Sequence, residues 1–384
     1  MQLTETIFQP SEAAEAAALG AENNVFVNGR FRVHAMTGLQ RYAEELISRM
    51  DGNLRVVEPD RNLTGLAGHA WEQWALPIRV RAGFLWSPCN TGPVGLRRQV
   101  VTIHDMFPLD HPEWFTPNFV RCFRAIVPRL LRRVQGVIAV SDYTKRRIAA
   151  AVPEAEDKIT VIHSGIGEQF RPARSNAPAE AAHALGLPSR DYLLSVSSIE
   201  PRKNVARILA AWERLLPHLP QDLWLVLAGK QGDKGVFSSE GTGRVPERVH
   251  FTGYVLDDFL PGLYAGAQAF LFPSLAEGFG FPALEAMASG TPVLTSLESS
   301  LPEVCGSAAY LVDPCKIHEI ALGIIELTSN QDLRKSLRIR GLSRAAKFKW
   351  DTAANRTWSV LERELCRGNT QAHTTKVHSR EAHV

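Results

Sequence analysis

The sequence holds no run of about 20 apolar residues, the length that a helix needs to cross a bilayer. Its first residues, MQLTETIFQPSEAAEAAALG, include acidic side chains and lack the basic start and apolar run of a secretory signal. The five cysteines are scattered and form neither a CxxC pair nor a Cys/His ligand pattern. A membrane span, a disulfide framework and a structural zinc site are therefore not expected, and a reducing cytoplasm is the expected compartment.

Several common ligand-binding motifs are also missing. No GxGxxG follows the first expected strand, which weakens a dehydrogenase interpretation, and no GxxxxGK[ST] indicates a P-loop kinase or ATPase. No DxD motif follows a strand, so nothing requires a divalent metal, and no metal ligands or other cofactor are predicted. The formal net charge of +3 is too small to indicate nucleic acid as a partner.

With 384 residues the chain is long enough for two hydrophobic cores. Strand-like apolar runs alternate with helical stretches, the clearest at 39–50 and 119–134, and this alternation predicts an α/β fold with parallel sheets. The runs fall into two blocks: NVFVNG, LRVVEP, GFLWSP, QVVTIHD and GVIAVS, then DYLLSVSSIE, DLWLVLAGK, RVHFTGY, AQAFLFPS and TPVLTS. Parallel sheets bind ligands at the carboxyl ends of their strands, so the expected site is a cleft between two domains.

The blocks define the expected domains. A segment rich in Pro, Ala and Ser, RPARSNAPAEAAHALGLPS, separates them, which places the first domain at 24–175 and the second at 186–348. A last helix is expected within 349–366. Residues 1–23 and the polar segment 368–384 are expected to be flexible.

The segment AFLFPSLAEGFGFPALEAMASGTPVLTS, residues 269–296, predicts a strand, a glycine loop and a helix that begins near Pro282. The backbone N–H groups of Gly278, Phe279 and Gly280 would then face forward at a helix N-terminus. Such a terminus binds phosphate through its N–H groups and the helix dipole, and glycine lets the anion approach the backbone.

Two glutamates stand at either end of this loop. Glu277 precedes it, and Glu285 is expected in the first helical turn. Glu285 alone is equally well explained as a surface carboxylate near the helix dipole. The two glutamates with the loop between them form a more specific pattern. Glu285 could accept hydrogen bonds from the hydroxyls of a ribose, and Glu277 could accept them from a transferred sugar. The spacing therefore indicates a nucleotide-diphosphate sugar as ligand.

This pattern resembles the E-x7-E signature of the retaining glycosyltransferase family 4, and the resemblance covers about residues 25 to 365. Other matching segments are TGLQRYAEEL, TIHDMFPLDHPEWF, VIHSGIGEQFRP, SVSSIEPRKNVARILAAWERL and FTGYVLDDFLPGLYAGAQAFLFPS. The resemblance implies the GT-B fold, in which two Rossmann-like domains face each other across a cleft and a C-terminal helix crosses back to the first domain.

The resemblance also implies roles for charged residues. Arg202 and Lys203 would stabilise the negative charge on the departing diphosphate, although such a pair is by itself usually a solvated surface pair. His104 would face the donor sugar with its ring or its backbone carbonyl, whereas a lone histidine is usually structural. Asp105 is expected to orient its loop rather than act as a base. Ser197 departs from the pattern, because many relatives have glycine there.

Weaker expectations concern the backbone. In relatives, the glycine turn at Gly38 approaches the diphosphate or the acceptor with Arg41 nearby, but a plain helix start explains it equally well. Gly253 and Tyr254 would lie against the nucleobase. No carboxylate nucleophile is evident. The resemblance therefore implies front-face transfer, with the leaving phosphate oxygen helping to deprotonate the acceptor.

The stretch 119–134 mixes apolar residues with five arginines and has no acidic residue. One interpretation is an amphipathic face on an anionic membrane, which would make the protein peripheral to the cytoplasmic face. The alternative is a core-packed helix with a solvated basic rim.

The predicted reaction is transfer of a hexose, with mannose from GDP-mannose as the first hypothesis. The expected acceptor is a saccharide or a polyprenyl-diphosphate-linked saccharide in polysaccharide biosynthesis. The mannose hypothesis depends on the likeness of the TGLQRYAEEL and EPRKN segments to those of bacterial mannosyl- and rhamnosyltransferases. Two alternatives stay open: a sugar-nucleotide 2-epimerase of related fold, and a non-catalytic sugar-nucleotide-binding scaffold.

Overall fold

A computed structural model describes residues 25–33, 36–50, 54–81, 83–173, 176–230 and 245–381, with side chains described as far as residue 367. Residues 1–23, which were expected to be flexible, lie outside the described part. The chain forms two compact units, one of residues 1–102, 129–138 and 354–384 and the other of residues 103–128 and 139–353. The domain bounds 24–175 and 186–348 stay predictions, because these units follow packing rather than chain order.

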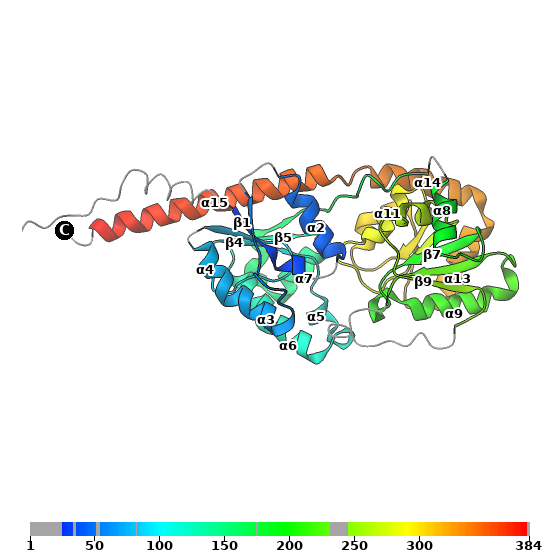
Figure 1. Ribbon diagram of the computed structural model, residues 1–384, viewed down its shortest axis with the longest axis horizontal. Helices are drawn as coiled ribbons and strands as arrows, with labels where there is room; N and C mark the ends of the chain where they lie inside the picture. The colour runs from blue at the N-terminus through cyan, green and yellow to red at the C-terminus, as the bar shows by residue number, and fades with distance from the viewer. Residues whose placement is uncertain are drawn as a thin grey trace, which may run out of the picture. The chain divides into compact units, whose positions relative to one another are not determined.

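The first sheet has six strands in the order β2-β1-β3-β4-β5-β6 (Figure 1). Its strands are β1 (Val25–Asn28), β2 (Leu54–Val57), β3 (Phe84–Ser87), β4 (Gln99–Ile103), β5 (Gly136–Ala139) and β6 (Ile159–Val161). The pairs β1–β2, β1–β3 and β3–β4 are parallel, as predicted. Strand β6 was not predicted, because only Ile159 of its three residues is buried and so short a segment carries no clear period.

Helical segments connect these strands. They are η1 (Gly29–Val33), α2 (Gly38–Ile47), α3 (Gly65–Ala70), η2 (Trp71–Ala75), α4 (Leu76–Val80), α5 (Phe107–Asp110), η3 (Pro112–Trp114), α6 (Pro117–Arg133), α7 (Asp142–Ala151) and η4 (Pro153–Lys158). Helix α2 begins with a capping box, in which Thr37 and Gln40 satisfy each other's backbone N–H groups. Helices α2 and α6 confirm the two predicted helices, with bounds shifted by a few residues.

Helix α6 decides between the two interpretations of residues 119–134. Its large apolar side chains are packed inside the protein, whereas its arginines lie mostly at the surface. The buried residues are Val120, Phe123, Val127, Leu130 and Leu131. The structure therefore supports the core-packed helix with a basic rim, and peripheral contact with an anionic membrane stays a prediction.

The second sheet is also parallel, in the order β12-β11-β10-β7-β8-β9. Its strands are β7 (Tyr192–Val196), β8 (Trp224–Ala228), β9 (Val249–Gly253), β10 (Ala269–Phe272), β11 (Val293–Ser296) and β12 (Tyr310–Val312). Five of them were predicted; β12 was missed, because only Val312 of its three residues is buried. The strand order reverses between β7 and β10, and the loops after these two strands therefore flank the position where such sheets bind ligands.

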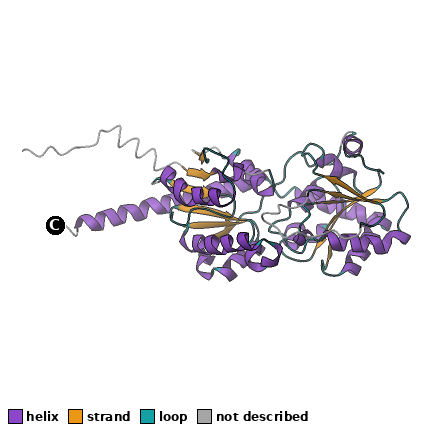
Figure 2. Ribbon diagram, turned by 60° about the horizontal axis from the view of Figure 1, so that its bottom comes forward, coloured by secondary structure: helices purple, strands orange, loops and turns teal. Residues whose placement is uncertain are grey.

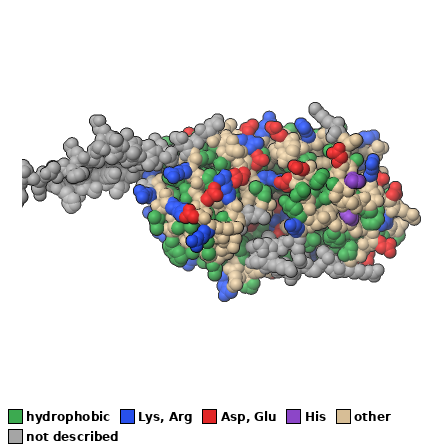
Figure 3. Space-filling view, in the orientation of Figure 1, with side chains coloured by type: hydrophobic (Ala, Val, Ile, Leu, Met, Phe, Trp, Pro, Cys, Tyr) green, Lys and Arg blue, Asp and Glu red, His purple; other side chains and the backbone are tan. Residues whose placement is uncertain are grey.

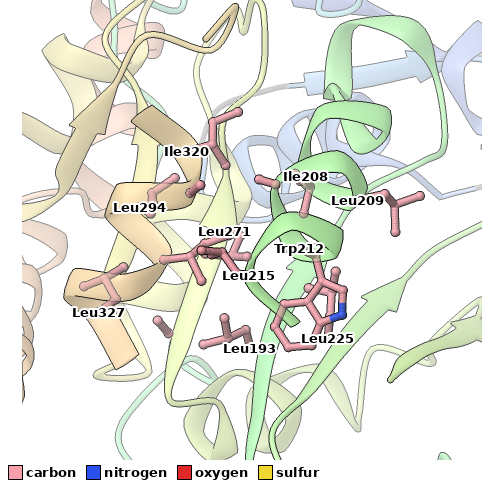
Figure 4. Close-up of a cluster of buried hydrophobic side chains, with 14 of the residues drawn as sticks. Leu193, Ile208, Leu209, Trp212, Leu215, Leu225, Leu271, Leu294, Ile320 and Leu327 are labelled. Atoms are coloured by element: carbon pink, nitrogen blue, oxygen red, sulfur yellow. The ribbon is translucent and has the colours of Figure 1, made fainter. Parts of the chain in front are cut away.

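Helices flank the strands of this sheet (Figures 1 and 2). They are α8 (Ala177–Ala184), η5 (Pro201–Lys203), α9 (Val205–Leu215), η6 (Leu216–His218), α10 (Leu260–Gly266), α11 (Phe281–Ala288), α12 (Leu301–Cys305), η7 (Gly306–Ala308), α13 (Ile317–Ser329) and α14 (Gln331–Ala345). Side chains from α9 and α13 meet those of β7, β8, β10 and β11 in a continuous apolar core, with Trp212 and Leu271 among its members (Figure 4). This core holds the carboxyl ends of β7 and β10 in place.

Replacing Leu271 with alanine is expected to lower the free energy of unfolding by about 2–5 kcal/mol, because its side chain is fully buried in this core. Leu322→Ala on α13 is the control, since Leu322 is exposed and its loss should cost less than about 0.5 kcal/mol. Urea unfolding measures both. Equal effects from the two variants would contradict the assignment of the core.

The last helix, α15 (Trp350–Glu381), is longer than predicted. From Ala354 onward it belongs to the same unit as β1, β2 and β3. A Cβ atom on Gly136 would lie 3.2 Å from Cγ of Glu364. This packing confirms the predicted return of the helix to the first domain, whereas the flexibility expected for 368–384 stays a prediction.

None of the helices in the described part of the chain is long and apolar enough to cross a membrane. On the face drawn in Figure 3, basic and acidic side chains are interspersed, which matches the small net charge.

Candidate functional site

The candidate site is formed by the two loops at the point where the strand order of the second sheet reverses. Strand β7 leads through Ser197 to η5, which carries Arg202 and Lys203. Strand β10 leads to Glu277 and the glycine loop, and α11 follows. The backbone N–H of Leu275 donates to the carbonyl of Arg202 at 2.8 Å, which joins the two loops directly.

Glu277 binds both predicted cations. Its Oε1 lies 2.6 Å from Nζ of Lys203, and its Oε2 lies 2.8 Å from Nη1 of Arg202. Arg202 also pairs through Nε with Oε1 of Glu200 at 2.7 Å, an ion pair without hydrogen-bond alignment. Glu277, Lys203 and Glu200 are all buried. Arg202 and Lys203 are therefore not a solvated surface pair, which was the alternative.

Burial and charge act in opposite directions on these groups. Burial raises the pKa of the Glu277 carboxyl, whereas the positive charges of Arg202 and Lys203 lower it. The charges together have the larger effect, so the pKa lies below its usual range. Burial, together with the charge of Arg202, lowers the pKa of Lys203. Burial also lowers the pKa of Arg202, but Glu200 and Glu277 outweigh this and raise it. The cluster thus holds an ionised carboxylate between two cations.

The glycine loop presents backbone donors. Gly280 is the N-cap of α11 with φ of 105°, a conformation that glycine adopts readily. The hydroxyl of Ser141 donates to the carbonyl of Gly278, and that of Ser300 donates to the carbonyl of Phe279. Within the described part of the chain, the N–H groups of Gly278, Phe279 and Gly280 donate to no other protein group. The loop is therefore held by its carbonyls and has its N–H groups available for an anion.

Glu285 is the fifth residue of α11, not a residue of its first turn as predicted. It is also buried rather than on the surface, and its Oε2 accepts a hydrogen bond from the hydroxyl of Tyr264 at 2.9 Å. Tyr264 comes from α10, so the carboxylate is oriented by a second element. The surface interpretation of Glu285 is therefore wrong.

His104 and Asp105 follow β4 and reach the glycine loop. The carbonyl of His104 accepts from Oγ1 of Thr144 at 3.1 Å, and a Cβ atom on Gly278 would lie only 1.9 Å from that carbonyl oxygen. Asp105 accepts from the backbone N–H of Phe107 at 3.3 Å, as expected of a residue that orients its loop. The carbonyl of His104 is thus used within the protein, and the role expected for its ring stays a prediction.

Gly253 and Tyr254 lie at the carboxyl end of β9. Gly253 has φ of 68°, and its carbonyl accepts from the N–H of Gly229 after β8. Nζ of Lys230 lies 4.7 Å from the ring centre of the exposed Tyr254. Beside these strand ends, a small pocket is lined by Ser195, Ser197, Ile199, Val205, Leu227, Ala228 and Gly229.

Gly38 is the first residue of α2 and lies in the other compact unit. Its capping box shows that the glycine turn is a regular helix start, which leaves its role at a ligand a prediction.

In the described part of the chain, three side chains that could bind a metal ion lie close together: Asp142, His163 and Glu303. The Glu303 carboxylate accepts from the backbone N–H groups of Asp142 and Tyr143 and contacts Nε2 of His163 at 2.6 Å. Both N–H groups belong to the first turn of α7, where a carboxylate is favoured. These hydrogen bonds explain the cluster as a helix cap that fixes α7 beside the glycine loop.

Sequence reasoning missed Ser141, Thr144, Ser300 and Tyr264, which hold the site. Ser141 and Thr144 form the N-cap of α7, and the serine–threonine spacing after a strand was a usable signal. Ser300 and Tyr264 reach the site from distant segments, and no local pattern indicates them.

Comparison with known proteins identifies the family. The model of the family described as glycosyl transferases group 1 matches residues 181–344, and that of glycosyltransferase family 4 matches residues 80–170. O-antigen chain mannosyltransferase B of Escherichia coli is 32% identical over 270 residues, covering 69% of this chain and 70% of that protein. The chain belongs to glycosyltransferase family 4 and is a glycosyltransferase.

Two further proteins show the range of similarity. Serotype-specific mannosyltransferase WbdA of Escherichia coli is 31% identical over 67% of this chain, but the match spans 32% of its own length. The crystal structure of Anabaena Alr3699/HepE in complex with UDP and glucose matches with a TM-score of 0.68 at 17% identity, covering 88% of this chain and 98% of that one. This likeness confirms the predicted GT-B fold.

Proposed function

We propose that this glycosyltransferase moves a hexose, with retention, from a nucleotide-diphosphate sugar to a saccharide or a polyprenyl-diphosphate-linked saccharide in polysaccharide biosynthesis. The observation that carries this proposal is the buried Glu277, held by Arg202 and Lys203 directly before a loop with unused N–H groups. Cations and backbone donors at a helix N-terminus together suit a diphosphate.

Each part of the donor would meet a different group. The diphosphate lies against the N–H groups of Gly278, Phe279 and Gly280. The hydroxyls of the ribose bind Glu285, whose orientation Tyr264 fixes. The nucleobase lies near Gly253 and Tyr254, and the glycine turn at Gly38 approaches the diphosphate or the acceptor.

In the reaction, the bond between the anomeric carbon and the diphosphate oxygen breaks, and negative charge develops on the leaving group. Arg202 and Lys203 stabilise that charge, and such stabilisation is most effective from groups held in place before the reaction. Glu277 orients the hydroxyls of the sugar, and the ring of His104 faces it. The acceptor enters on the same face, and the leaving oxygen takes its proton. Because the cations and amides supply the charge stabilisation, we propose that no metal is required.

The donor hypothesis is mannose from GDP-mannose. Its support is the identity with the Escherichia coli mannosyltransferases, whereas the Anabaena structure holds UDP. The acceptor would be part of a growing polysaccharide, as the O-antigen names of relatives suggest. Peripheral contact with the cytoplasmic face of a membrane stays a hypothesis that α6 no longer supports.

A thermal-shift panel with GDP, UDP, dTDP and ADP and their common sugars tests the donor site. A ligand at 100 times its dissociation constant should add about 2.7 kcal/mol of stability, a shift of a few degrees. Glu285→Ala should lose this shift, because the ribose loses its acceptor. Glu298→Ala, on an exposed glutamate, is the control and should keep it. If no nucleotide stabilises the folded wild type, the donor-site proposal is wrong.

Analysis of the products formed from the sugars that stabilise the protein separates the alternatives. Binding with conversion of the donor sugar in the absence of any acceptor would identify a 2-epimerase. Binding without turnover for every acceptor tried would favour a sugar-nucleotide-binding scaffold, although a scaffold has no need of cations at a leaving group.

A further inference from the structure

The cations of the donor site are surrounded by more negative charge than they carry. Arg202 and Lys203 supply two positive charges. Glu277 contacts both of them, and Glu200 pairs with Arg202 from the same loop. Asp105 is the third carboxyl whose charge acts on Arg202. If all three carboxylates are ionised, the cluster has one net negative charge before any diphosphate arrives.

A diphosphate would add two negative charges to this cluster. Buried like charges oppose each other strongly, and a carboxyl in such a group is neutralised by a proton instead. Glu277 contacts both cations and Glu200 pairs with Arg202, so both carboxylates are held ionised by a cation.

Asp105 lies beside the glycine loop, since a Cβ atom on Gly278 would lie 3.3 Å from its Cβ. In the described part of the chain it has no ion pair, and it accepts a hydrogen bond from the N–H of Phe107. Asp105 is therefore the carboxyl that can take a proton at least cost.

We propose that Asp105 is a positioning residue that takes up one proton when the nucleotide-diphosphate sugar binds, which removes one negative charge from the surroundings of Arg202 as the diphosphate arrives. This inference rests on the proposed function. It assigns Asp105 a role in donor affinity beyond orienting its loop, and it makes donor binding dependent on pH.

The groups that face Asp105 support this role. Burial raises the pKa of its carboxyl to about 6; Arg202 and the N–H of Phe107 lower it, and Glu277 and Glu200 raise it. Helix α7 contributes Tyr143, a titratable group whose phenol interacts electrostatically with the Asp105 carboxyl. Its pKa is raised by burial above the ordinary tyrosine value, so Tyr143 stays neutral near pH 7. The proton is thus taken up at Asp105.

The direction of the pH effect follows from linkage. Without donor, Asp105 is largely ionised above pH 6, and with donor it is protonated, so binding takes up a proton in that range. Affinity for the donor should therefore be highest near pH 6 and fall by up to about tenfold per pH unit as the pH rises above it. The diphosphate of a nucleotide sugar is a diester that does not titrate between pH 6 and 8, so the ligand adds no slope of its own.

Calorimetric titration of the full chain with GDP-mannose and with UDP-glucose, between pH 6 and 8 in buffers of different ionisation enthalpy, measures both affinity and proton uptake. The wild type should take up close to one proton at pH 7. Asp105→Asn keeps an acceptor for the N–H of Phe107 and should bind with no proton uptake and with little dependence on pH. Asp110→Asn is the matched control, because Asp110 pairs with Arg147 outside the cluster, and it should behave as the wild type.

Two results would overturn the inference. If the wild type binds a nucleotide sugar without proton uptake, or if Asp105→Asn keeps the uptake, the role of Asp105 is wrong and the proposed function stands. If neither nucleotide sugar binds the folded wild type, the proposed donor site fails and the inference fails with it.

Discussion

Glu277→Gln is expected to lower kcat by about 10²–10³-fold. Its carboxylate holds Lys203 at 2.6 Å and Arg202 at 2.8 Å, and the amide of glutamine can neither balance their charges nor accept from both. The two cations would then shift from the positions in which we propose that they stabilise the leaving group. Turnover of the donor that binds in the thermal-shift panel is the measurement.

The same substitution should also lower stability. Removing one partner of a buried ion pair leaves uncompensated charge and costs about 3–5 kcal/mol in the free energy of unfolding. Glu298→Gln makes the same chemical change on an exposed side chain and should cost less than about 0.5 kcal/mol. A folded Glu277→Gln variant with wild-type turnover would remove Glu277 from the catalytic site.

Gly278→Ala is expected to lower kcat/KM by about 10²-fold, because it displaces the loop that we propose binds the diphosphate. The added Cβ atom would lie 1.9 Å from the carbonyl oxygen of His104, far inside van der Waals contact. That carbonyl is held by Thr144, so the glycine loop must move instead. Overpacking of this kind also costs about 1–3 kcal/mol of stability.

Gly95→Ala is the matched control for this loop. No atom lies within 4 Å of the position that its Cβ would take, so activity and stability should be unchanged. Steady-state kinetics with saturating acceptor, together with thermal unfolding of both variants, separates displacement of the loop from loss of folding. Normal donor affinity in Gly278→Ala would show that the loop does not contact the diphosphate.

Periodicity was informative where elements are long or fully buried. Strand β10 is a continuous apolar run, and β7 is interrupted only by Ser195; buried strands of parallel sheets have this pattern in sequence. Strands β6 and β12 have three residues each and are only partly buried, so neither the period nor the composition of their sequence distinguishes them from loops. For α6 the sequence pattern was also insufficient, because an amphipathic pattern indicates a buried face but does not show what covers that face.

The site divided in a similar way. Glu277, Gly278, Phe279 and Gly280 were predicted because their spacing is local and a strand–loop–helix unit gives it physical meaning. The sequence left the environment of Glu285 undecided, because its partner Tyr264 lies 21 residues away and only folding brings the two together.

The sequence by itself determined the class of fold, the family and the loops of the candidate site, because local spacing and strand order follow directly from the chain. Only the tertiary structure decided how the charges of the site balance. The pairing of Glu277 with Arg202 joins residues 75 apart in sequence, and Asp105 comes from another strand again. Burial and pKa depend on everything packed around a group, so no local pattern could have shown how the charges of this cluster are arranged.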